Sequence, residues 1–457
     1  MAETPLTSLR FRRTHRFRPV QLVADGFEVD TSATTNRQGL HVLADSPPAP
    51  YVAIELTVTG TEGPVCAGLV CSGPVCSGVV AEDQHVLVTW DPASSRISIS
   101  VRRAGRTRVL RRRKVALTAP FGLAFALCEN QVTALVDTGS GWHPVVSERG
   151  RVAALLDLRD EVTLAEHTYA WGGTDVEPSS VRAGLFGMVG LRDPHLVQHA
   201  DGSPYLLDGR LWFTWTCAGL GFFQQAHWSV WSMDPADPAG MRLESHLFSR
   251  RDGLVLGDHA GQLVRDGERW LLATSSWGDF EPGSIHVRHT ESGEDLLHGV
   301  HVLDTVRTPL PTTYGTWDPA LTRVDGTWHV AYVESPSQRP FRFRPALAAT
   351  TADTWHTALT EVARLGNLGQ CEGPIMVRTG GGTWLLTSDG QRHVYAIFDL
   401  TGSQVGQLDA PYVTNIPHPQ LVPDPAGGWM LVTFDGTGFE RSLLGYGGHG
   451  DVVVMHS

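Results

Sequence analysis

The sequence of 457 residues predicts an all-β protein in which an N-terminal β-sandwich precedes a five-bladed β-propeller. Three observations predict this fold. Short apolar or alternating runs, separated by Gly, Asp or Asn, fill the first third of the chain and carry no helical period. A unit of strand, polar turn and Trp- or Tyr-bearing strand then occurs five times. Glycine (49 residues) and proline (28) are abundant enough to supply the turns that so many strands need.

Length and composition limit the class of protein. A chain of this length exceeds one ordinary domain, and 42% hydrophobic residues can build large cores. The net charge of −12 argues against nucleic acid as the main partner. No run approaches the roughly 18–20 apolar residues that span a bilayer, so no membrane partner is expected. Residues 1–20 contain five arginines and no continuous apolar stretch, so we expect no secretory signal and a soluble, cytoplasmic protein.

The first domain is predicted over residues 19–178, after an N-terminal arm at residues 1–18. Its strands resemble the jelly-roll sandwiches of lectin and laminin-G type, which often accompany carbohydrate enzymes; a purely structural companion domain is the alternative. The basic run at 102–114 lies on alternating strands and is interpreted as a solvated sheet face. Residues 155–166 fit one helix or a strand, and the turn-rich residues 174–180 mark the domain boundary. Expected strands lie at 52–58, 85–90, 97–101, 121–127 and 131–136.

The propeller is predicted over residues 179–457. Each of the five copies opens with a polar residue beside Pro or Gly: Asp193, Asp258, Asp318, Glu372 and His418. The separations of 65, 60, 54 and 46 residues (258 − 193, 318 − 258, 372 − 318 and 418 − 372) each hold one four-stranded blade. Because the innermost strands of a propeller surround one central funnel, these five side chains are expected to face one another.

Three of the five openings are carboxylates, namely Asp193, Asp318 and Glu372. Cleavage of a glycosidic bond requires one protonated and one ionised carboxyl group beside the bond. Like charges crowded in one funnel separate the pKa values of such groups. The alternative is that Asp-Pro and Glu-Gly-Pro only form turns. Three acids at corresponding openings favour the chemical interpretation.

The motifs Arg192-Asp193-Pro194, Trp317-Asp318-Pro319 and Cys371-Glu372-Gly373-Pro374 resemble those of glycoside hydrolase family 43, whose members include α-L-arabinofuranosidases, β-xylosidases and arabinanases. The resemblance covers residues from about 185 to 457. It implies inverting hydrolysis of furanoside or pentoside linkages, with Asp193 as general base, Asp318 as modulator of the acid's pKa and Glu372 as general acid. The sandwich precedes the propeller here, whereas the family usually places it after, so the sugar stays open.

Substrate-binding positions are predicted from the copies and from nearby aromatic residues, whose rings stack on sugar faces. They are His259, Trp215, Phe223, Trp277, Trp317, Arg344 and His418. By the resemblance, His418 lies near a central ion or water cluster, so a structural Ca²⁺ is a candidate while no cofactor is required. Two alternatives to the inverting hydrolase are a non-catalytic carbohydrate-binding propeller and a retaining fructoside-type hydrolase. The oligomeric state is open.

Overall fold

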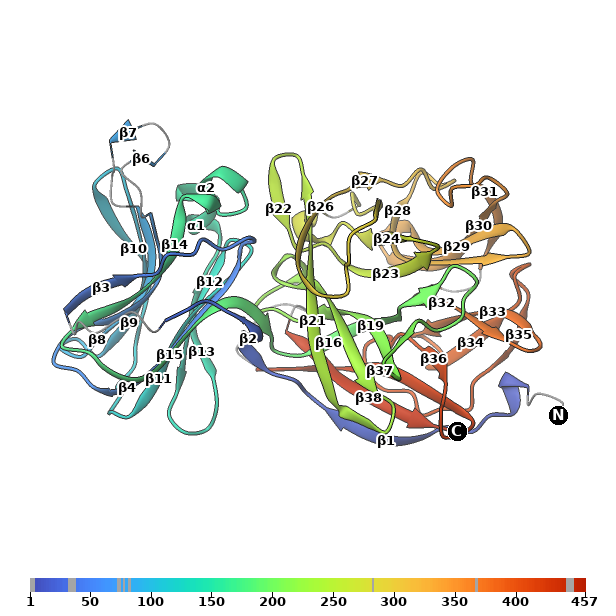
Figure 1. The fold of residues 1–457 in the computed structure, drawn as a ribbon, viewed down its shortest axis with the longest axis horizontal. Coiled ribbons are helices and arrows are strands. Elements are labelled where there is room, and N and C mark those ends of the chain that lie inside the picture. Colours follow the sequence, from blue (N-terminus) through green and yellow to red (C-terminus); the bar gives the residue numbers. More distant parts are fainter. Residues whose placement is uncertain are drawn as a thin grey trace.

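A computed structural model describes residues 5–31, 38–71, 75–76, 79–80, 84–281, 283–365, 369–440 and 448–457. Figure 1 shows two bodies side by side, the N-terminal strands on the left and the C-terminal sheets on the right. Strands dominate both bodies, which confirms the all-β expectation. The described helices are short: α1 (Gly150–Leu155), α2 (Glu161–Ala165) and the 3-10 turns η1 (Leu6–Ser8), η2 (Phe223–Gln225) and η3 (Trp277–Asp279). None of them has the length and apolar composition needed to cross a bilayer.

The N-terminal body contains two six-stranded antiparallel sheets. The first has the order β10 (Arg106–Lys114), β9 (Arg96–Arg103), β8 (His85–Asp91), β5 (Val65–Cys71), β14 (His167–Thr174) and β3 (Gln38–Val42). The second has the order β13 (His143–Glu148), β12 (Gln131–Asp137), β11 (Phe121–Cys128), β4 (Tyr51–Gly60), β15 (Glu177–Met188) and β2 (Gln21–Glu28). A separate pair is formed by β6 (Val75–Cys76) and β7 (Val79–Val80).

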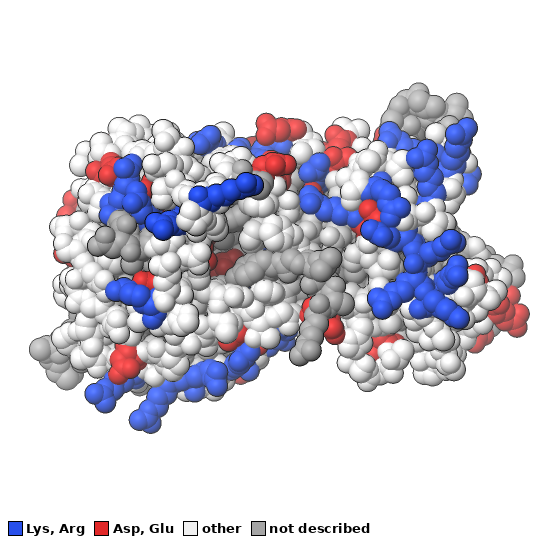
Figure 2. All heavy atoms as spheres, turned by 180° about the vertical axis from the view of Figure 1, so that it is seen from behind, with Lys and Arg blue, Asp and Glu red and all other residues white. Residues whose placement is uncertain are grey.

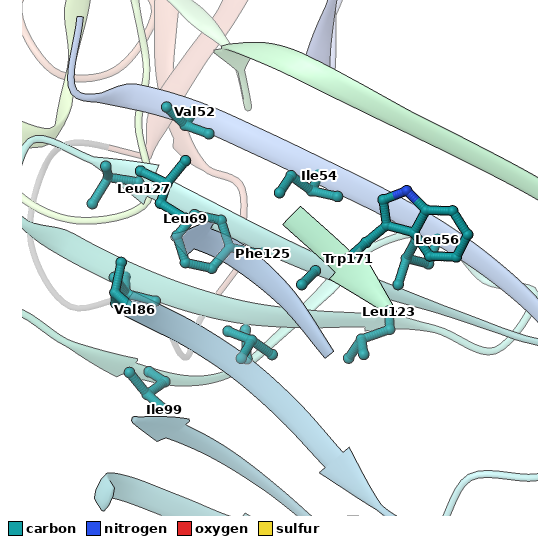
Figure 3. Packing of buried hydrophobic residues seen from close by; sticks show 14 of the residues in the cluster. Val52, Ile54, Leu56, Leu69, Val86, Ile99, Leu123, Phe125, Leu127 and Trp171 are labelled. Carbon is teal, nitrogen blue, oxygen red and sulfur yellow. The ribbon is translucent and has the colours of Figure 1, made fainter. Parts of the chain in front are cut away.

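The two sheets bury a shared hydrophobic core. Ile54 of β4 and Phe125 of β11 pack with Leu69, Val86 and Ile99 of the first sheet, all without exposed surface (Figure 3). Strand β11 is buried along its whole length because its other face also packs, through Ala124 and Ala126, against the C-terminal body. This two-sided burial explains why β11 is a continuous apolar run rather than an alternating one.

The predicted domain boundary at residue 178 falls within a strand. Strand β15, which pairs with β4 and β2 of the second N-terminal sheet, runs from Glu177 to Met188, ten residues past 178 (188 − 178 = 10). The turn-rich residues 174–180 instead connect one N-terminal sheet to the other and begin β15. The segment expected to be one helix or a strand holds the end of α1 and the whole of α2, which begins where the Asp160 carboxylate accepts the Thr163 N–H at 2.8 Å.

Five sheets form the described part of the C-terminal body. We call the strand that begins each sequence copy the first strand of its sheet, and we name the sheet after it. The β16 sheet has β16 (Leu191–Leu196), β19 (Arg210–Cys217), β20 (His227–Asp234), β21 (Asp237–Arg251) and β22 (Leu254–Leu256), with β18 (Leu206–Leu207) on β19 and β26 (Gly299–Asp304) on β21. The β23 sheet has β17 (Gln198–His199), β23 (His259–Asp266), β24 (Arg269–Ser275), β25 (Val287–Ser292) and β27 (Val306–Arg307). The β28 sheet has β28 (Gly315–Val324), β29 (Thr327–Gln338), β30 (Phe341–Thr350) and β31 (Thr360–Arg364). The β32 sheet has β32 (Cys371–Thr379), β33 (Gly382–Asp389), β34 (Val394–Phe398) and β35 (Gln404–Gln407). The β36 sheet has β36 (Gln420–Pro423), β37 (Trp429–Gly438), β38 (His449–His456) and β1 (Arg12–Phe17).

The first strands of these sheets contact one another in cyclic order, β16 with β23, β28, β32, β36 and again β16. Each first strand pairs with the second strand of its sheet in an antiparallel hairpin, as the sequence copies predicted. The β36 sheet takes its outer strand from the far end of the chain. Strand β1, inside the segment expected to be an arm, pairs with β38 from Arg12↔His456 to Phe17↔Val452 (Figure 1).

The basic run at 102–114 lies on β9 and β10 of the N-terminal body. Along β10 every side chain is exposed except Leu110, as expected for a solvated sheet edge. Figure 2 shows Lys and Arg side chains gathered over this body. Charged residues on an edge strand discourage pairing with another chain.

Candidate active site

A bulge interrupts the first strand of four sheets at the same place. Pairing with the second strand stops after Arg192, His259, Trp317 and Glu372 and resumes three residues later in each case. The residue that follows has a positive φ, namely 53° at Asp193, 54° at Ala260, 49° at Asp318 and 62° at Gly373. A bulge bends its strand and redirects side chains. The recurrent bulge therefore gives four strands the same local geometry where they meet.

This register refines the comparison of the sequence copies. Asp193 and Asp318 occupy the same bulge position, whereas Glu372 lies one position earlier. Asp258, taken as the opening of the second copy, lies two residues before its bulge residue and bonds Arg251 at 3.0 Å. An alignment of the copies on their first polar residue could not detect this shift, because the bulge position is occupied by Asp, Ala or Gly and no single amino acid marks it in the sequence.

The three predicted carboxylates line one cavity of about 720 Å³. Arg192, His259 and His418 lie beside them. The remaining large or polar side chains of its wall are Phe222, Phe223, Trp277, Phe280, Ile285, Trp317, Gln338, Phe341, Phe343, Gln370, His393, Tyr412, Thr414, Asn415 and Ile416. A concave site with a few converging polar groups is the usual form of a small-molecule site.

Short contacts link the acids. The Nε of Arg192 lies 3.3 Å from Asp193 Oδ2. The Nε2 of His418 lies 3.8 Å from Asp193 Oδ1 and 3.4 Å from Asp318 Oδ2. Asp318 Oδ2 also accepts the N–H of Gly373 at 3.2 Å, while the indole N–H of Trp317 donates to Glu372 Oε2 at 3.3 Å. Each acid therefore has different neighbours.

Asp193 is the acid whose ionised form is stabilised. Burial raises its pKa, but His418, Arg192, His259 and a hydrogen bond from Thr216 outweigh burial and lower the pKa below its ordinary value. Burial also lowers the pKa of His418, while the charge of Asp193 raises it and the charge of Arg192 lowers it. Asp193 is consequently a carboxylate at pH 7.

The other two acids have the opposite bias. Burial, followed by the charge of Asp193, raises the pKa of Glu372 to about 8 against the hydrogen bond from Trp317 and the charge of Arg192. Burial, followed by the charges of Glu372 and Asp193, raises the pKa of Asp318 well above its ordinary value. The cavity therefore combines an ionised carboxylate, Asp193, with a carboxyl group, Glu372, that is protonated at neutral pH.

Calcium takes six to eight oxygen ligands. His195, close enough to His418 and Asp193 to feel their charges, is buried, and neither of its ring nitrogens has a hydrogen-bond partner among the described residues. The amide oxygens of Gln420 and Gln262 already accept the backbone N–H groups of Leu196 and Leu321. Within the described ranges no group of three His, Cys, Asp or Glu side chains could hold a metal ion.

Two predicted substrate-binding residues do not line the cavity. Trp215 is fully buried in a core between strands. Arg344 lies 2.9 Å from the buried carboxylate of Glu334. Residues 341–344 alternate Phe and Arg, and Phe341 and Phe343, which share one face of β30, line the cavity instead of the arginines. The other predicted positions, His259, Phe223, Trp277, Trp317 and His418, all line it.

The N-terminal body fixes the cavity rim that carries Phe222 and Phe223. The Phe222 N–H donates to Gln225 Oε1 at 2.7 Å, and Gln225 Nε2 donates to the buried carboxylate of Glu129 at 3.1 Å. The buried hydroxyl of Tyr51 contacts the carbonyl oxygen of Gln224 at 2.8 Å. Sequence reasoning did not connect the two bodies, since these partners lie about a hundred residues or more from the rim.

A second support lies behind Trp277. The guanidinium of Arg251 bonds both Asp258 and Asp279, and Asp258 Oδ1 accepts the N–H of Gly278 at 2.9 Å. These contacts hold η3, and with it the Trp277 ring, against the cavity. Asp258 thus supports the site from behind rather than facing into it.

No protein-family model matches the chain, and no curated protein matches it. Similar solved structures include an α-L-arabinanase of Penicillium chrysogenum complexed with arabinobiose, at 14% identity over 74% of this chain and 91% of that one, with a TM-score of 0.39. They also include the GH43_1 enzyme of Xanthomonas citri complexed with xylose, at 15% identity over 58% of this chain and 86% of that one, with a TM-score of 0.41. A family 117 glycoside hydrolase of Zobellia galactanivorans is similar at 10% identity over 58% of this chain and 84% of that one, with a TM-score of 0.42. Glycoside hydrolase family 43, which the motifs of this sequence resemble, is thus represented among these structures.

Proposed function

We propose that the protein is an inverting glycoside hydrolase that acts on furanoside or pentoside linkages. The observation that carries the proposal is the pair of acids with opposite protonation in one cavity, Asp193 ionised and Glu372 protonated. Glycoside hydrolysis needs this pair, because one acid must activate water while the other donates a proton to the leaving oxygen.

The proposed reaction uses three residues. Asp193 removes a proton from a water molecule as its oxygen bonds to the anomeric carbon. The bond from that carbon to the leaving oxygen breaks, and Glu372 gives its proton to that oxygen. Asp318, held by the Gly373 N–H and beside His418, orients the sugar and modulates the acid. The products are a sugar of inverted configuration and the free aglycone, and two proton transfers through solvent restore both acids.

We also propose that the C-terminal body is a five-bladed β-propeller and the N-terminal body a β-sandwich. The cyclic contacts of the five first strands and the pairing of β1 with β38 support the propeller. The core shared by two six-stranded sheets supports the sandwich. A propeller gathers the ends of its innermost strands around one funnel, which is where the acids of three sheets meet.

The experiment compares the wild type with Glu372→Gln and Asp193→Asn on aryl α-L-arabinofuranosides and aryl β-D-xylosides. We expect activity on one of these sugars and a loss of at least a hundredfold in kcat in each variant. Proton NMR of the first-formed sugar should reveal inversion. Retention of the anomeric configuration, or activity only on fructosides, would contradict the inverting assignment and favour a retaining fructoside-type hydrolase. Sugar binding by a folded wild type that hydrolyses none of these glycosides would indicate a carbohydrate-binding protein instead.

A further inference from the structure

The cavity has two chemically different halves. Residues 370–418 contribute polar side chains, among them Gln370, His393 and Asn415. Residues 222–343 contribute what we name the aromatic wall: Phe222, Phe223, Trp277, Phe280, Phe341 and Phe343. In this half, apart from the acid Asp318 and the ring of His259, Gln338 is the one polar side chain that the described residues bring to the lining.

The wall is continuous rather than a set of separate rings. Ring centres are 4.6 Å apart between Phe223 and Trp277, and 5.9 Å apart between Trp277 and Trp317. From Trp317 the contacts pass to Phe343 at 5.5 Å, and Phe343 lies 5.0 Å from Phe341. Three sheets therefore contribute to one apolar surface.

The two ends of the wall retain exposed apolar area at the mouth of the cavity. Phe222 is 37% exposed and Phe341 is 46% exposed. Large aromatic side chains left exposed beside a polar site mark a surface that a ligand covers. The two residues come from the loop before η2 and from β30, so the exposed area flanks the entrance on two sides.

The position of Glu372 indicates which part of a substrate meets the wall. Its carboxyl group bonds the indole of Trp317, whose ring contacts both Trp277 and Phe343. If Glu372 protonates the leaving oxygen, the group attached to that oxygen extends along the wall. The sugar ring that reacts with water lies toward Asp193 and the polar half.

We propose that the leaving group of the natural substrate is a flat apolar, aryl-type aglycone bound by the aromatic wall, and not a further sugar of a polysaccharide. This inference rests on the proposed glycosidase function. A sugar in this place would bring several hydroxyl groups to a surface where Gln338 is the one polar side chain besides Asp318 and His259, and unpaired hydroxyl groups there weaken binding. An aryl group gains burial and ring stacking at the same surface.

The test compares methyl, benzyl and 2-naphthylmethyl pentosides, whose leaving alcohols have similar acidity, with the matching pentose disaccharide. We expect kcat/KM to rise at least tenfold from methyl to benzyl and again to naphthylmethyl, and to be lowest or near methyl for the disaccharide. Phe341→Ala and Phe222→Ala should each reduce the benzyl-to-methyl ratio by fivefold or more. Tyr314→Ala is the control, since Tyr314 is 38% exposed but does not line the cavity.

A binding measurement separates this inference from the function on which it rests. Calorimetry with Glu372→Gln would compare benzyl and methyl 1-thiopentosides, which the variant cannot cleave. Tighter binding of the benzyl compound, lost in Phe341→Ala, supports the wall whatever the hydrolytic result. Equal binding, or a disaccharide that is the best substrate, overturns the aryl assignment while the glycosidase proposal stands. Absence of hydrolysis with preferential benzyl binding would reject the glycosidase alone.

Discussion

Replacing Trp317 by Phe should move the alkaline limb of the pH–rate profile to higher pH. Glu372 is active when protonated, so the rate is full below its pKa of about 8 and falls as pH rises through it. The indole N–H bonds the carboxylate at 3.3 Å and thereby lowers this pKa. A hydrogen bond to a charged group contributes about 1.5–3 kcal/mol, and a long one nearer to 1. Since one pKa unit equals about 1.4 kcal/mol, the limb should rise by roughly 0.7 unit.

The assay is kcat/KM on a phenyl glycoside from about pH 5 to 10, because a poor leaving group makes the rate depend on the acid. Trp277→Phe is the matched control: Trp277 lines the same cavity, and none of the described hydrogen bonds joins it to Glu372. An alkaline limb that stays in place or moves down in Trp317→Phe, or that moves equally in both variants, would refute the assignment of Glu372 as the acid.

Three further predictions concern stability and binding. Arg251→Met should lower the free energy of unfolding by about 3–5 kcal/mol, because the Arg251 side chain is 4% exposed and its loss removes the cation that pairs with Asp258 and Asp279. Arg250→Met is the control: this side chain is 36% exposed, and its loss should cost under about 1 kcal/mol in the same urea titrations. Arg344→Ala should leave KM unchanged but lower the melting temperature, because Arg344 pairs with the buried Glu334 and not with substrate. Burial raises the folded-state pKa of Glu372, so the stability that its proton contributes is full below about pH 4.5 and is lost as pH rises toward 8. Calorimetry should therefore find that the melting temperature of Glu372→Gln rises by several degrees relative to that of the wild type between pH 5 and pH 8. A difference in melting temperature that stays constant over this range would contradict the linkage.

Much of the site could be predicted because its residues carry local sequence signals. The Asp-Pro and Glu-Gly-Pro motifs open repeated strands, and Asp193, Asp318 and Glu372 do share one cavity. The five hairpins also follow the repeat. Repetition makes such features visible, since each copy confirms the period of the others.

Other features depend on long-range packing, which a local pattern does not contain. Alternation in residues 341–344 predicts two faces of a strand, yet only the fold decides that Phe341 rather than Arg344 faces the cavity. Trp215 has a side chain of the kind that stacks on sugar faces, but it is completely buried in the fold. The contact of Tyr51 with the rim loop joins residues 173 positions apart. Each of these required the tertiary structure.

The pairing of β1 with β38 has a consequence for dividing the chain into its two bodies. Strand β1 precedes the N-terminal body in the chain, whereas the other members of its sheet follow the other four sheets of the C-terminal body. The β36 sheet therefore forms only when segments from both sides of the N-terminal body come together. A fragment that begins at the boundary between the two bodies would expose the edge of β38, an unpaired edge open to aggregation. Expression of the C-terminal body alone should therefore require β1 to be supplied, for example by joining residues 5–18 after Ser457 through a flexible linker.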